Sequence, residues 1–250
     1  TIQSQSVDRV WVPAGTAAAA GAGDVVVQST SYGETVGTNA FTYSAPGMKV
    51  LGTNGAVVAS GNAAQAANGT KFVSLLAGAS WTNTFTIAND GTETLNISGF
   101  GISDSRFKIA GLPATVAAGT ASTFTVRFAP DAAGSYAGML TISNNASTAV
   151  YVMNLAGSCF TLSTDAGPLG GGNMVTITNG LFGTITNVLV GGIAAAIQSS
   201  GANWVTITVP AIGSAGAVDI VVQTSDNGDT TFAGVYTVNP AGRIGVEPDW

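Results

Sequence analysis

The chain has 250 residues, of which 46% are hydrophobic and only 8% are charged, whereas ordinary globular proteins have about 25% charged residues. Seven basic residues against thirteen acidic ones give a net charge of −6. Because the basic residues form no cluster, the composition excludes a nucleic-acid-binding surface. The absence of histidine and the single cysteine, Cys159, exclude His-dependent triads, His-ligated zinc and an internal disulfide framework, and no apolar stretch is long enough for a membrane-spanning helix.

Short strand-like runs dominate the chain, and helical periodicity is nearly absent. Runs rich in Val, Ile, Thr, Phe and Tyr alternate with clusters of Gly, Asn, Asp and Pro, at the spacing of an all-β sandwich. Three segments alternate apolar and polar residues cleanly: TNTFTIAN (82–89), STFTVRF (122–128) and GMLTISN (138–144). This pattern is typical of half-buried strands in antiparallel sheets. The sequence therefore predicts an all-β fold.

The first long strand pair, DVVVQSTSYGETVGTNAFTY at residues 24–43, occurs a second time near the other end of the chain. The second copy, DIVVQTSDNGDTTFAGVYTV, covers residues 219–238, and the two align without a gap at an offset of 195 residues. A related run comes before each copy, VWVPAG at 10–15 and ITVPAI at 207–212. The repeat predicts that both ends of the chain contain the same part of one domain type.

The middle segment, residues 47–159, contains FTIANDGTETLNISGFGI, then STFTVRFAPDAAGSYAGMLTISNN, and then YVMNLAGS. In this order the runs resemble the Ig-like choice-of-anchor D domain of bacterial surface proteins, which is related to the ASH (abnormal-spindle/Hydin) class. The resemblance implies an Ig-like β-sandwich and is nearly silent about a ligand.

Residues 160–241 resemble an IPT/TIG domain, another Ig-like sandwich. The resemblance is carried by GPLGGGNMVTITNGLFG, NVLVGG, ANWVTITVPA and the repeated AVDIVVQTSDNGDTTFAGVYTV. The glycines at 170–172 are followed by neither a helical pattern nor G-x-x-x-x-G-K-[ST], so they predict a turn and not a phosphate loop.

Residues 1–46 then correspond to the C-terminal half of another TIG-like sandwich. We therefore expect tandem immunoglobulin-like sandwiches, in the order half TIG-like, ASH-like and complete TIG-like. Residues 242–250 are a tail or the start of a next domain. A half-sandwich leaves apolar strand faces and open edges in water, which promotes association. Adjacent domains of a longer chain or copies of the same chain are expected to complete it.

Large apolar residues near the two ends are the predicted assembly contacts. Trp250 ends the chain on a segment that needs a partner, and Ile244 and Val246 precede it. Trp11 lies in an alternating strand of the half-sandwich. Packing in a core or at a sheet edge is the default expectation for tryptophan, and it applies to Trp11 and Trp81 alike.

The sequence contains no catalytic or cofactor-binding motif, and one weak metal candidate. In the turn SDNGDT, Asp226 and Asp229 offer hard oxygen ligands to Ca²⁺, but the EF-hand ligand layout with its closing Glu is missing. A plain hairpin turn explains the same residues. For Cys159 we expect a buried, inert thiol, with an intermolecular disulfide as the alternative.

Three N-x-[ST] sequons lie in the middle segment, at Asn68, Asn96 and Asn145. They predict glycan sites if the protein is secreted by a eukaryote, and they carry no meaning in a bacterial protein.

These observations favour a non-enzymatic structural subunit or repeat segment of an extracellular filament, appendage or surface array. The expected partners are copies of itself or adjacent domains, joined by β-strand addition, and the low surface charge lets such units pack together. The first alternative is a carbohydrate-binding or spacer region of a secreted hydrolase or adhesin, which an exposed coplanar pair of Trp or Tyr would favour. The second alternative is a ciliary or centrosomal ASH-type scaffold, which would be expected to carry many more charges.

Overall fold

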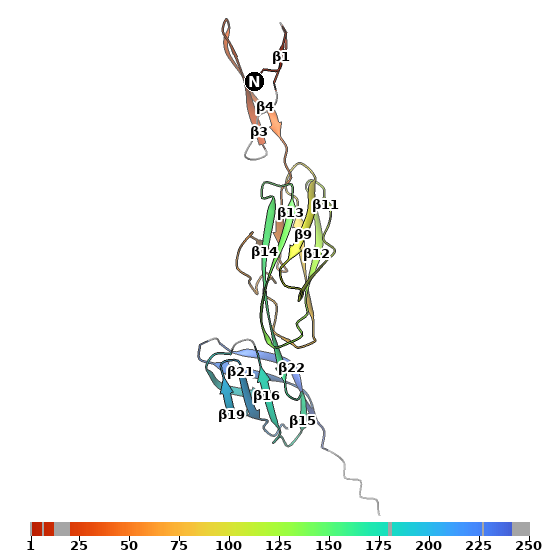
Figure 1. Ribbon diagram of the computed structural model, residues 1–250, viewed down its shortest axis with the longest axis vertical. Coiled ribbons are helices and arrows are strands. Elements are labelled where there is room, and N and C mark those ends of the chain that lie inside the picture. The colour runs from red at the N-terminus through yellow and green to blue at the C-terminus, as the bar shows by residue number, and fades with distance from the viewer. Residues whose placement is uncertain (1, 7, 13–20, 180–181, 227, 242–250) are drawn as a thin grey trace, which may run out of the picture.

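A computed structural model of the chain describes residues 2–6, 8–12, 21–179, 182–226 and 228–241. Every secondary-structure element in these ranges is a β-strand, so the all-β prediction is confirmed. Figure 1 shows three parts in a row along the long axis: hairpins at the N-terminal end, a middle sandwich and a C-terminal sandwich. The described residues include no helix long and apolar enough to span a membrane.

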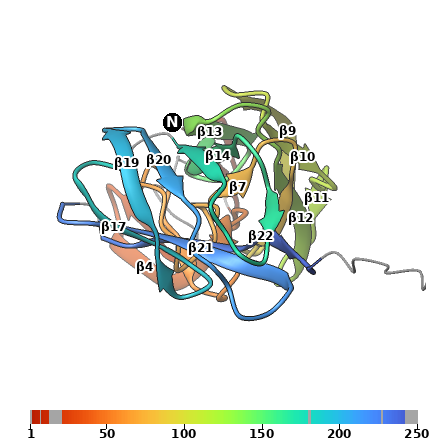
Figure 2. The ribbon, with the colours of Figure 1, turned by 90° about the horizontal axis from the view of Figure 1, so that it is seen from below.

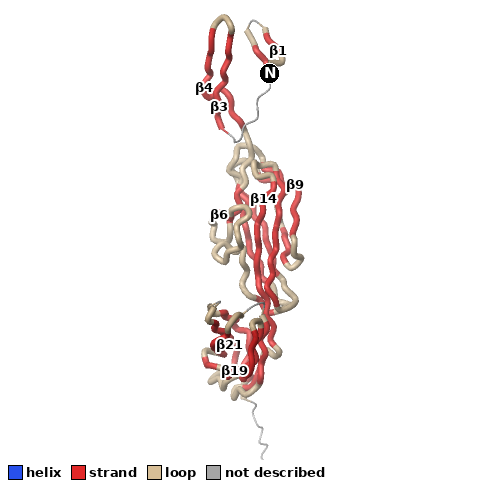
Figure 3. The backbone as a smooth tube through the Cα atoms, turned by 60° about the vertical axis from the view of Figure 1, so that its left-hand side comes forward, coloured by secondary structure: helices blue, strands red, loops and turns tan. Residues whose placement is uncertain are grey.

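Two small antiparallel sheets make up the N-terminal part. β1 pairs with β2, and β3 pairs with β4. Their bounds are Ser4–Gln5 (β1), Val10–Trp11 (β2), Gly21–Ser29 (β3) and Gly33–Tyr43 (β4). No described residue before Val50 is buried, so these hairpins have no hydrophobic core of their own. Figure 3 shows both hairpins at one end of the molecule, beyond the middle sandwich.

The middle part is a sandwich of two sheets. One sheet has the order β10-β12-β8-β5-β6, and the other is formed by β11-β9-β13-β14, with β7 beside β14. The buried side chains of the two sheets form one hydrophobic core. The strand bounds are Lys49–Leu51 (β5), Val57–Val58 (β6), Leu75–Leu76 (β7), Trp81–Ala88 (β8), Leu95–Ile102 (β9), Phe107–Ala110 (β10), Thr115–Val116 (β11), Ala121–Phe128 (β12), Gly134–Asn144 (β13) and Val150–Leu162 (β14).

The three alternating segments predicted as strands are β8, β12 and β13. Because side chains alternate between the two faces of a strand, every second residue enters the core. Seven apolar side chains at these positions are at most 1% exposed: Phe85, Ile87, Phe124, Val126, Phe128, Leu140 and Ile142. Burial of each stabilises the fold by roughly 1.5–3 kcal/mol. The strand prediction and its core face are both confirmed.

The C-terminal part is a second sandwich. One sheet has the order β15-β22-β21-β17-β18, and β16, β20 and β19 continue from the end of β14 as the other sheet; Figure 2 shows β17, β21 and β22 on one side and β14, β19 and β20 on the other. The glycines at 170–172 form the predicted turn, in which the Gly171 amide donates to the Pro168 carbonyl at 3.0 Å. The strand bounds are Ala166–Pro168 (β15), Met174–Thr178 (β16), Ile185–Val190 (β17), Ile193–Ala194 (β18), Ala196–Gly201 (β19), Trp204–Thr208 (β20), Gly216–Thr224 (β21) and Thr230–Asn239 (β22).

β14 connects the two sandwiches without a break. It pairs with β13 as far as Cys159 and with β16 from Thr161 onward. Beside it β7 runs parallel, with Leu76 opposite Phe160. The side chain of Leu75 belongs to the first core, whereas Leu76 and Phe160 pack in the second. The predicted boundary after residue 159 falls inside this strand, so the two sandwiches share a sheet instead of being joined by a loop.

Asn89 is a buried polar side chain that ties together three segments at one end of the middle sandwich. Its Oδ1 accepts hydrogen bonds from the amides of Gly47 (2.9 Å) and Gly91 (3.0 Å). Its Nδ2 donates to the carbonyls of Glu93 (2.7 Å) and Val116 (2.9 Å). The sequence predicts only a turn at 89–91. The bonds to Gly47 and Val116 are long-range, and a local turn pattern contains no information about them.

Two buried acidic groups make the stability of the fold depend on pH in the alkaline range. Burial raises the pKa of the Tyr151 phenol to about 12. Burial, assisted by the negative charge of Asp131, raises the pKa of the Cys159 thiol to about 11. In the unfolded chain these groups ionise at about 10 and 8.5. Between the unfolded and folded pKa values the unfolded state loses protons that the folded state keeps, which favours unfolding.

We therefore expect the free energy of unfolding to be unaffected by these groups at neutral pH and to fall as the pH rises from about 9 to 12. Each group contributes a slope of about 1.4 kcal/mol per pH unit where its two states differ. Urea denaturation at a series of pH values measures this slope. In Tyr151→Phe the decline should be shallower, and an equally steep decline in this variant would contradict the assignment to Tyr151.

Candidate functional site

The N-terminal hairpin β3–β4 is a second copy of the hairpin β21–β22. β3 and β21 begin and end at the same offset of 195 residues. In both hairpins the strand register shifts at the same point, beside an aspartate. The repeated sequence therefore folds into the same element twice.

In each hairpin an aspartate side chain accepts a hydrogen bond from the amide of a residue with a positive φ angle. The Oδ1 atom of Asp24 accepts from the amide of Asn39 at 2.8 Å, and Oδ1 of Asp219 accepts from the amide of Gly234 at 2.7 Å. The residues that donate have φ values of 53° and 62°, in the left-handed region that Gly and Asn tolerate best. This match shows that the two copies agree in detail and not only in strand order.

A second polar contact is repeated near the hairpin turns. Gln28 Nε2 donates to Glu34 Oε2 at 2.9 Å, and Gln223 Nε2 donates to Asp229 Oδ2 at 3.2 Å. Both pairs join the two arms of their hairpin, and both hydrogen bonds are exposed. The exchange of Glu for Asp preserves the contact because both side chains present a carboxylate acceptor.

The first hairpin, β1–β2, matches β19–β20. Val10 of β2 lies opposite Gln5 in β1, as Ile207 of β20 lies opposite Ile197 in β19. β1 to β4 thus correspond to β19 to β22, which is the second half of the C-terminal sandwich. The described residues before β5 include no counterpart of β15, β16, β17 or β18. We call β1 to β4 the open half-sandwich.

Residues that form a core in the complete sandwich are exposed in the open half-sandwich. Val25 and Val27 are 39% and 48% exposed, whereas their equivalents Ile220 and Val222 are fully buried. Phe41 is likewise exposed, although its equivalent Tyr236 is buried. Apolar area of this kind gains free energy when it is covered, at about 25 cal/mol per Å².

A groove of about 570 Å³ runs between the two hairpins of the half-sandwich. Its lining includes Val25 and Val27, whose equivalents Ile220 and Val222 are buried in the core of the complete sandwich. Its apolar lining comes from both hairpins: Ile2, Val10, Val12, Val25, Val26 and Val27. A contiguous apolar groove at one end of a chain with so few charges is the feature of this molecule best suited to hold a partner.

The groove also has open strand edges. In the complete sandwich β21 lies between β22 and β17, and β20 lies between β19 and β16. In the open half-sandwich β3 pairs only with β4, and β2 only with β1, among the described residues. Each therefore presents backbone N–H and C=O groups that a further strand can bond.

Of the four predicted assembly contacts, the structure describes one. Trp11 is 62% exposed, and it is not among the residues that line the groove, although its neighbours Val10 and Val12 are. It is therefore neither in a core nor in the groove, and its place is the outer face of β2. Ile244, Val246 and Trp250 lie outside the described residues.

The two aspartates of the calcium hypothesis take part in hairpin hydrogen bonds. The Asp226 carboxylate accepts the Thr184 amide at 2.9 and 3.1 Å, which ties the β21–β22 turn to the segment before β17. Asp229 accepts from Gln223 as described above. Across the described parts of the chain, no three or more His, Cys, Asp or Glu side chains are grouped so that they could hold a metal ion. Both aspartates therefore have a structural role, because their carboxylates accept hydrogen bonds within the sandwich.

The three sequon asparagines differ in their surroundings. Asn96 is exposed on β9. Asn145 Nδ2, the atom that would carry a glycan, donates to the Thr94 carbonyl at 3.2 Å. The Asn68 side chain accepts two hydrogen bonds from Thr70, and Thr70 itself is buried. Asn96 is therefore the most accessible of the three for modification.

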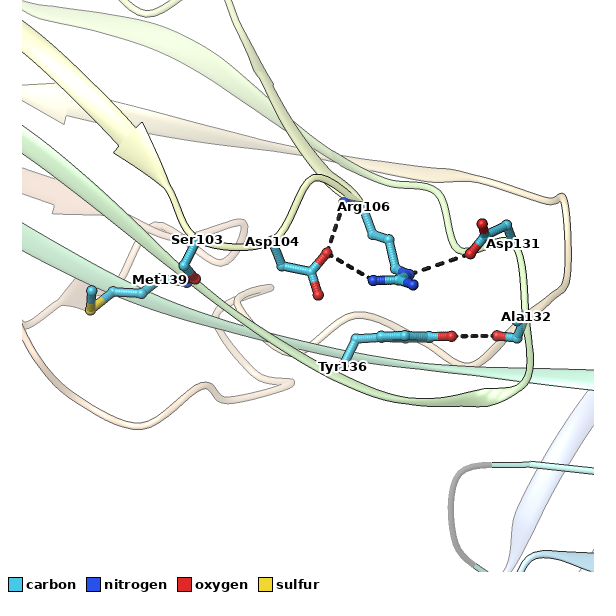
Figure 4. A network of polar contacts seen from close by, with 7 residues as sticks. All are labelled: Ser103, Asp104, Arg106, Asp131, Ala132, Tyr136 and Met139. Carbon is cyan, nitrogen blue, oxygen red and sulfur yellow. Dashed lines mark hydrogen bonds and ion pairs between the residues drawn. The ribbon is translucent and has the colours of Figure 1, made fainter.

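A charged cluster that the sequence did not indicate lies on the middle sandwich (Figure 4). The Arg106 guanidinium bonds to Asp104 at 3.3 Å and to Asp131 at 3.4 Å, and it covers the ring of Tyr136 at 4.3 Å. Tyr136 in turn donates to the Ala132 carbonyl at 2.7 Å. Desolvation lowers the pKa of Arg106 but the carboxylates raise it, and the net shift is upward. With its carboxylates paired to a cation, the cluster braces the loop at 130–134 and offers no general acid or base.

Comparison with known proteins gives distant similarities in structure. The chain matches no protein-family profile and no curated protein sequence. It is similar to the plexin A4 extracellular region (16% identity, 66% of this chain and 17% of that chain, TM-score 0.26). It is also similar to the secreted serine protease VesC from Vibrio cholerae (11% identity, 67% and 49%, TM-score 0.31) and to titin domains I67–I69 (10% identity, 79% and 66%, TM-score 0.27). The chain thus spans about a sixth of the plexin A4 chain. Identities and TM-scores this low assign neither a family nor a function.

Proposed function

We propose that this chain is a non-enzymatic structural module of an extracellular or cell-surface array or filament. Its body consists of the ASH-like and TIG-like sandwiches, and its open half-sandwich is the attachment surface for copies of itself or for adjacent domains. The observation that carries the proposal is the open half-sandwich, with apolar residues exposed at positions that are buried in the complete copy.

The connection between the two sandwiches supports a mechanical role. β14 passes through both of them, and β7 runs beside it at the junction. A continuous strand hydrogen-bonded on both sides resists bending more than a flexible linker does. A stiff body of this kind suits a spacer or a filament subunit.

The surface chemistry supports close packing between molecules. Only 8% of the residues are charged, so neighbouring modules repel one another weakly. The same low charge argues against the ciliary or centrosomal alternative, whose intracellular members would be expected to carry many more charges.

The two exposed tryptophans of the described residues and the Phe41–Tyr43 pair favour attachment over carbohydrate binding. Trp81, expected in a core or at a sheet edge, is 51% exposed at the start of β8, where its Nε1 donates to Asn83. Trp11 is exposed on a different sheet, in the half-sandwich. Phe41 and Tyr43 pack edge to face at an interplanar angle of 75°. None of these arrangements among the described residues is the coplanar platform that sugar stacking uses.

Sedimentation velocity over a range of protein concentrations, combined with electron microscopy, tests the proposal. We expect the wild-type chain to associate with increasing concentration. Val25→Asp combined with Val27→Asp should shift it to the monomer, because charged groups resist burial in an interface. The matched control is Val36→Asp: Val36 is as exposed as Val27 but does not line the groove, so its association should be retained. A wild-type chain that stays monomeric at all concentrations would contradict self-assembly.

A further inference from the structure

The segment that would complete the half-sandwich has a template inside the same chain. In the complete sandwich, β15 to β18, which come from residues 166–194, cover the strands equivalent to β2, β3 and β4. The two hairpins share their register shift, their aspartate bond and their left-handed residue. The surface that this segment fits therefore occurs twice in the molecule, and among the described residues it is covered once.

The template specifies the register on the open edge of β3. β17 runs antiparallel to β21, with Val188 opposite Val222. At the offset of 195 residues Val27 is equivalent to Val222, so an added strand in this register places the equivalent of Val188 opposite Val27. In the same way Val25 is equivalent to Ile220, and the equivalent of Val190 lies opposite Val25. A strand added here in the β17 register places its inward-facing side chains beside Val25 and Val27, two of the valines that line the groove.

The template also specifies the register on the open edge of β2. β16 runs antiparallel to β20, with Val175 opposite Ile207. The position equivalent to Ile207 is Val10, so a strand in the β16 register lies on the free side of β2. The groove is then closed from both sheets, as it is in the complete sandwich.

We infer that the open half-sandwich is completed by β-strand addition from a polypeptide segment with the pattern of residues 164–195. One strand of the segment lies antiparallel to β3 in the register of β17, and another lies antiparallel to β2 in the register of β16. This inference rests on the proposed role of the half-sandwich as the attachment surface, and it names the chemistry of the partner: a polypeptide, not a glycan or a lipid.

The composition of the template indicates which kind of polypeptide segment the groove binds. Residues 164–195 contain one charged residue, Asp165, together with a Gly-rich turn and alternating apolar positions in β16 and β17. Backbone hydrogen bonds supply affinity in strand addition, and pockets for alternate side chains supply specificity. A charged residue at either inward-facing valine of the added strand would have to be buried without a partner.

A synthetic peptide with the sequence of residues 164–195, added to the full chain, tests the inference. We expect saturable binding and slowed amide hydrogen exchange in residues 21–29, measured by mass spectrometry. Val27→Asp in the chain should abolish the protection, whereas Val36→Asp should leave it unchanged. The peptide with Val188→Asp and Val190→Asp is the matched control ligand and should not bind. Protection that is absent, or equal for both peptides, would overturn the inference.

A fusion removes the dependence on peptide solubility. Residues 164–195 are joined ahead of Thr1, which restores the order of segment and hairpins found in the C-terminal sandwich. We expect this chain to be monomeric and to protect β3 from hydrogen exchange in the absence of added peptide. A fusion that associates as strongly as the wild type and leaves β3 unprotected would overturn the inference.

The two proposals fail in different ways. If the wild type associates but neither peptide nor fusion protects β3, the half-sandwich is an attachment surface that works by another geometry, such as two half-sandwiches packed face to face. If the wild type stays monomeric while the fusion protects β3, self-assembly is wrong and strand addition stands.

Discussion

Val222→Asp should unfold the C-terminal sandwich, whereas Val27→Asp, the same change at the equivalent position, should leave the melting of both sandwiches unchanged. Val222 is fully buried in the second core, and Val27 is half exposed in the open half-sandwich. A carboxylate without a partner in an apolar core costs at least about 4 kcal/mol. At the exposed site it remains hydrated and costs little.

Urea denaturation followed by circular dichroism at low protein concentration measures this contrast. Low concentration matters because association would bury Val27 and make its substitution costly as well. The control is Val36→Asp, which lies on the partner strand and should match the wild type. Equal destabilisation by Val27→Asp and Val222→Asp would mean that the half-sandwich is already covered in the isolated chain.

Asn89→Leu should destabilise the middle sandwich by roughly 3–5 kcal/mol. The substitution removes both acceptor and donor atoms while keeping a similar volume. It leaves the Gly47 and Gly91 amides and the Glu93 and Val116 carbonyls without their side-chain partner. The bond to Val116 is buried and the other three are partly buried, and a buried backbone group that loses its partner is costly because water cannot replace the bond.

Differential scanning calorimetry measures the effect as a lowered transition of the middle sandwich. The matched control is Asn96→Ala in the same sandwich, where the side chain is exposed, and its expected effect is within about 0.5 kcal/mol. An Asn89→Leu variant with wild-type stability would show that water satisfies the freed groups and that the side chain is not a structural tie.

The strands of the middle sandwich could be predicted because their information is local. In β8, β12 and β13 the apolar residues alternate with polar ones, and alternation alone decides which face enters a core. The repeated hairpin was also visible in the sequence, since the two copies align without a gap. The structure adds that even the aspartate bond and the left-handed residue are repeated.

Other features could not be read from the sequence because they join distant segments. The bonds of Asn89 to Gly47 and Val116, and the ion pair of Arg106 with Asp131, depend on loops brought together by sheet packing. The exposure of Trp81 depends on what covers the start of β8, which alternation does not encode. Likewise, the sequence places a domain boundary after residue 159, and only the structure shows β14 running through it.

The amino-acid sequence alone establishes that the chain is all-β and that residues 24–43 repeat residues 219–238. These conclusions follow from alternation, turn residues and a gapless repeat, all of which are properties of neighbouring positions along the chain. Only the packing in three dimensions shows that Val25 and Val27 line an open groove while their equivalents are buried. Exposure depends on what packs against a side chain, and the two equivalent hairpins differ in exposure because, among the described residues, β15 to β18 cover β20 to β22 and no equivalent of these strands covers β2 to β4.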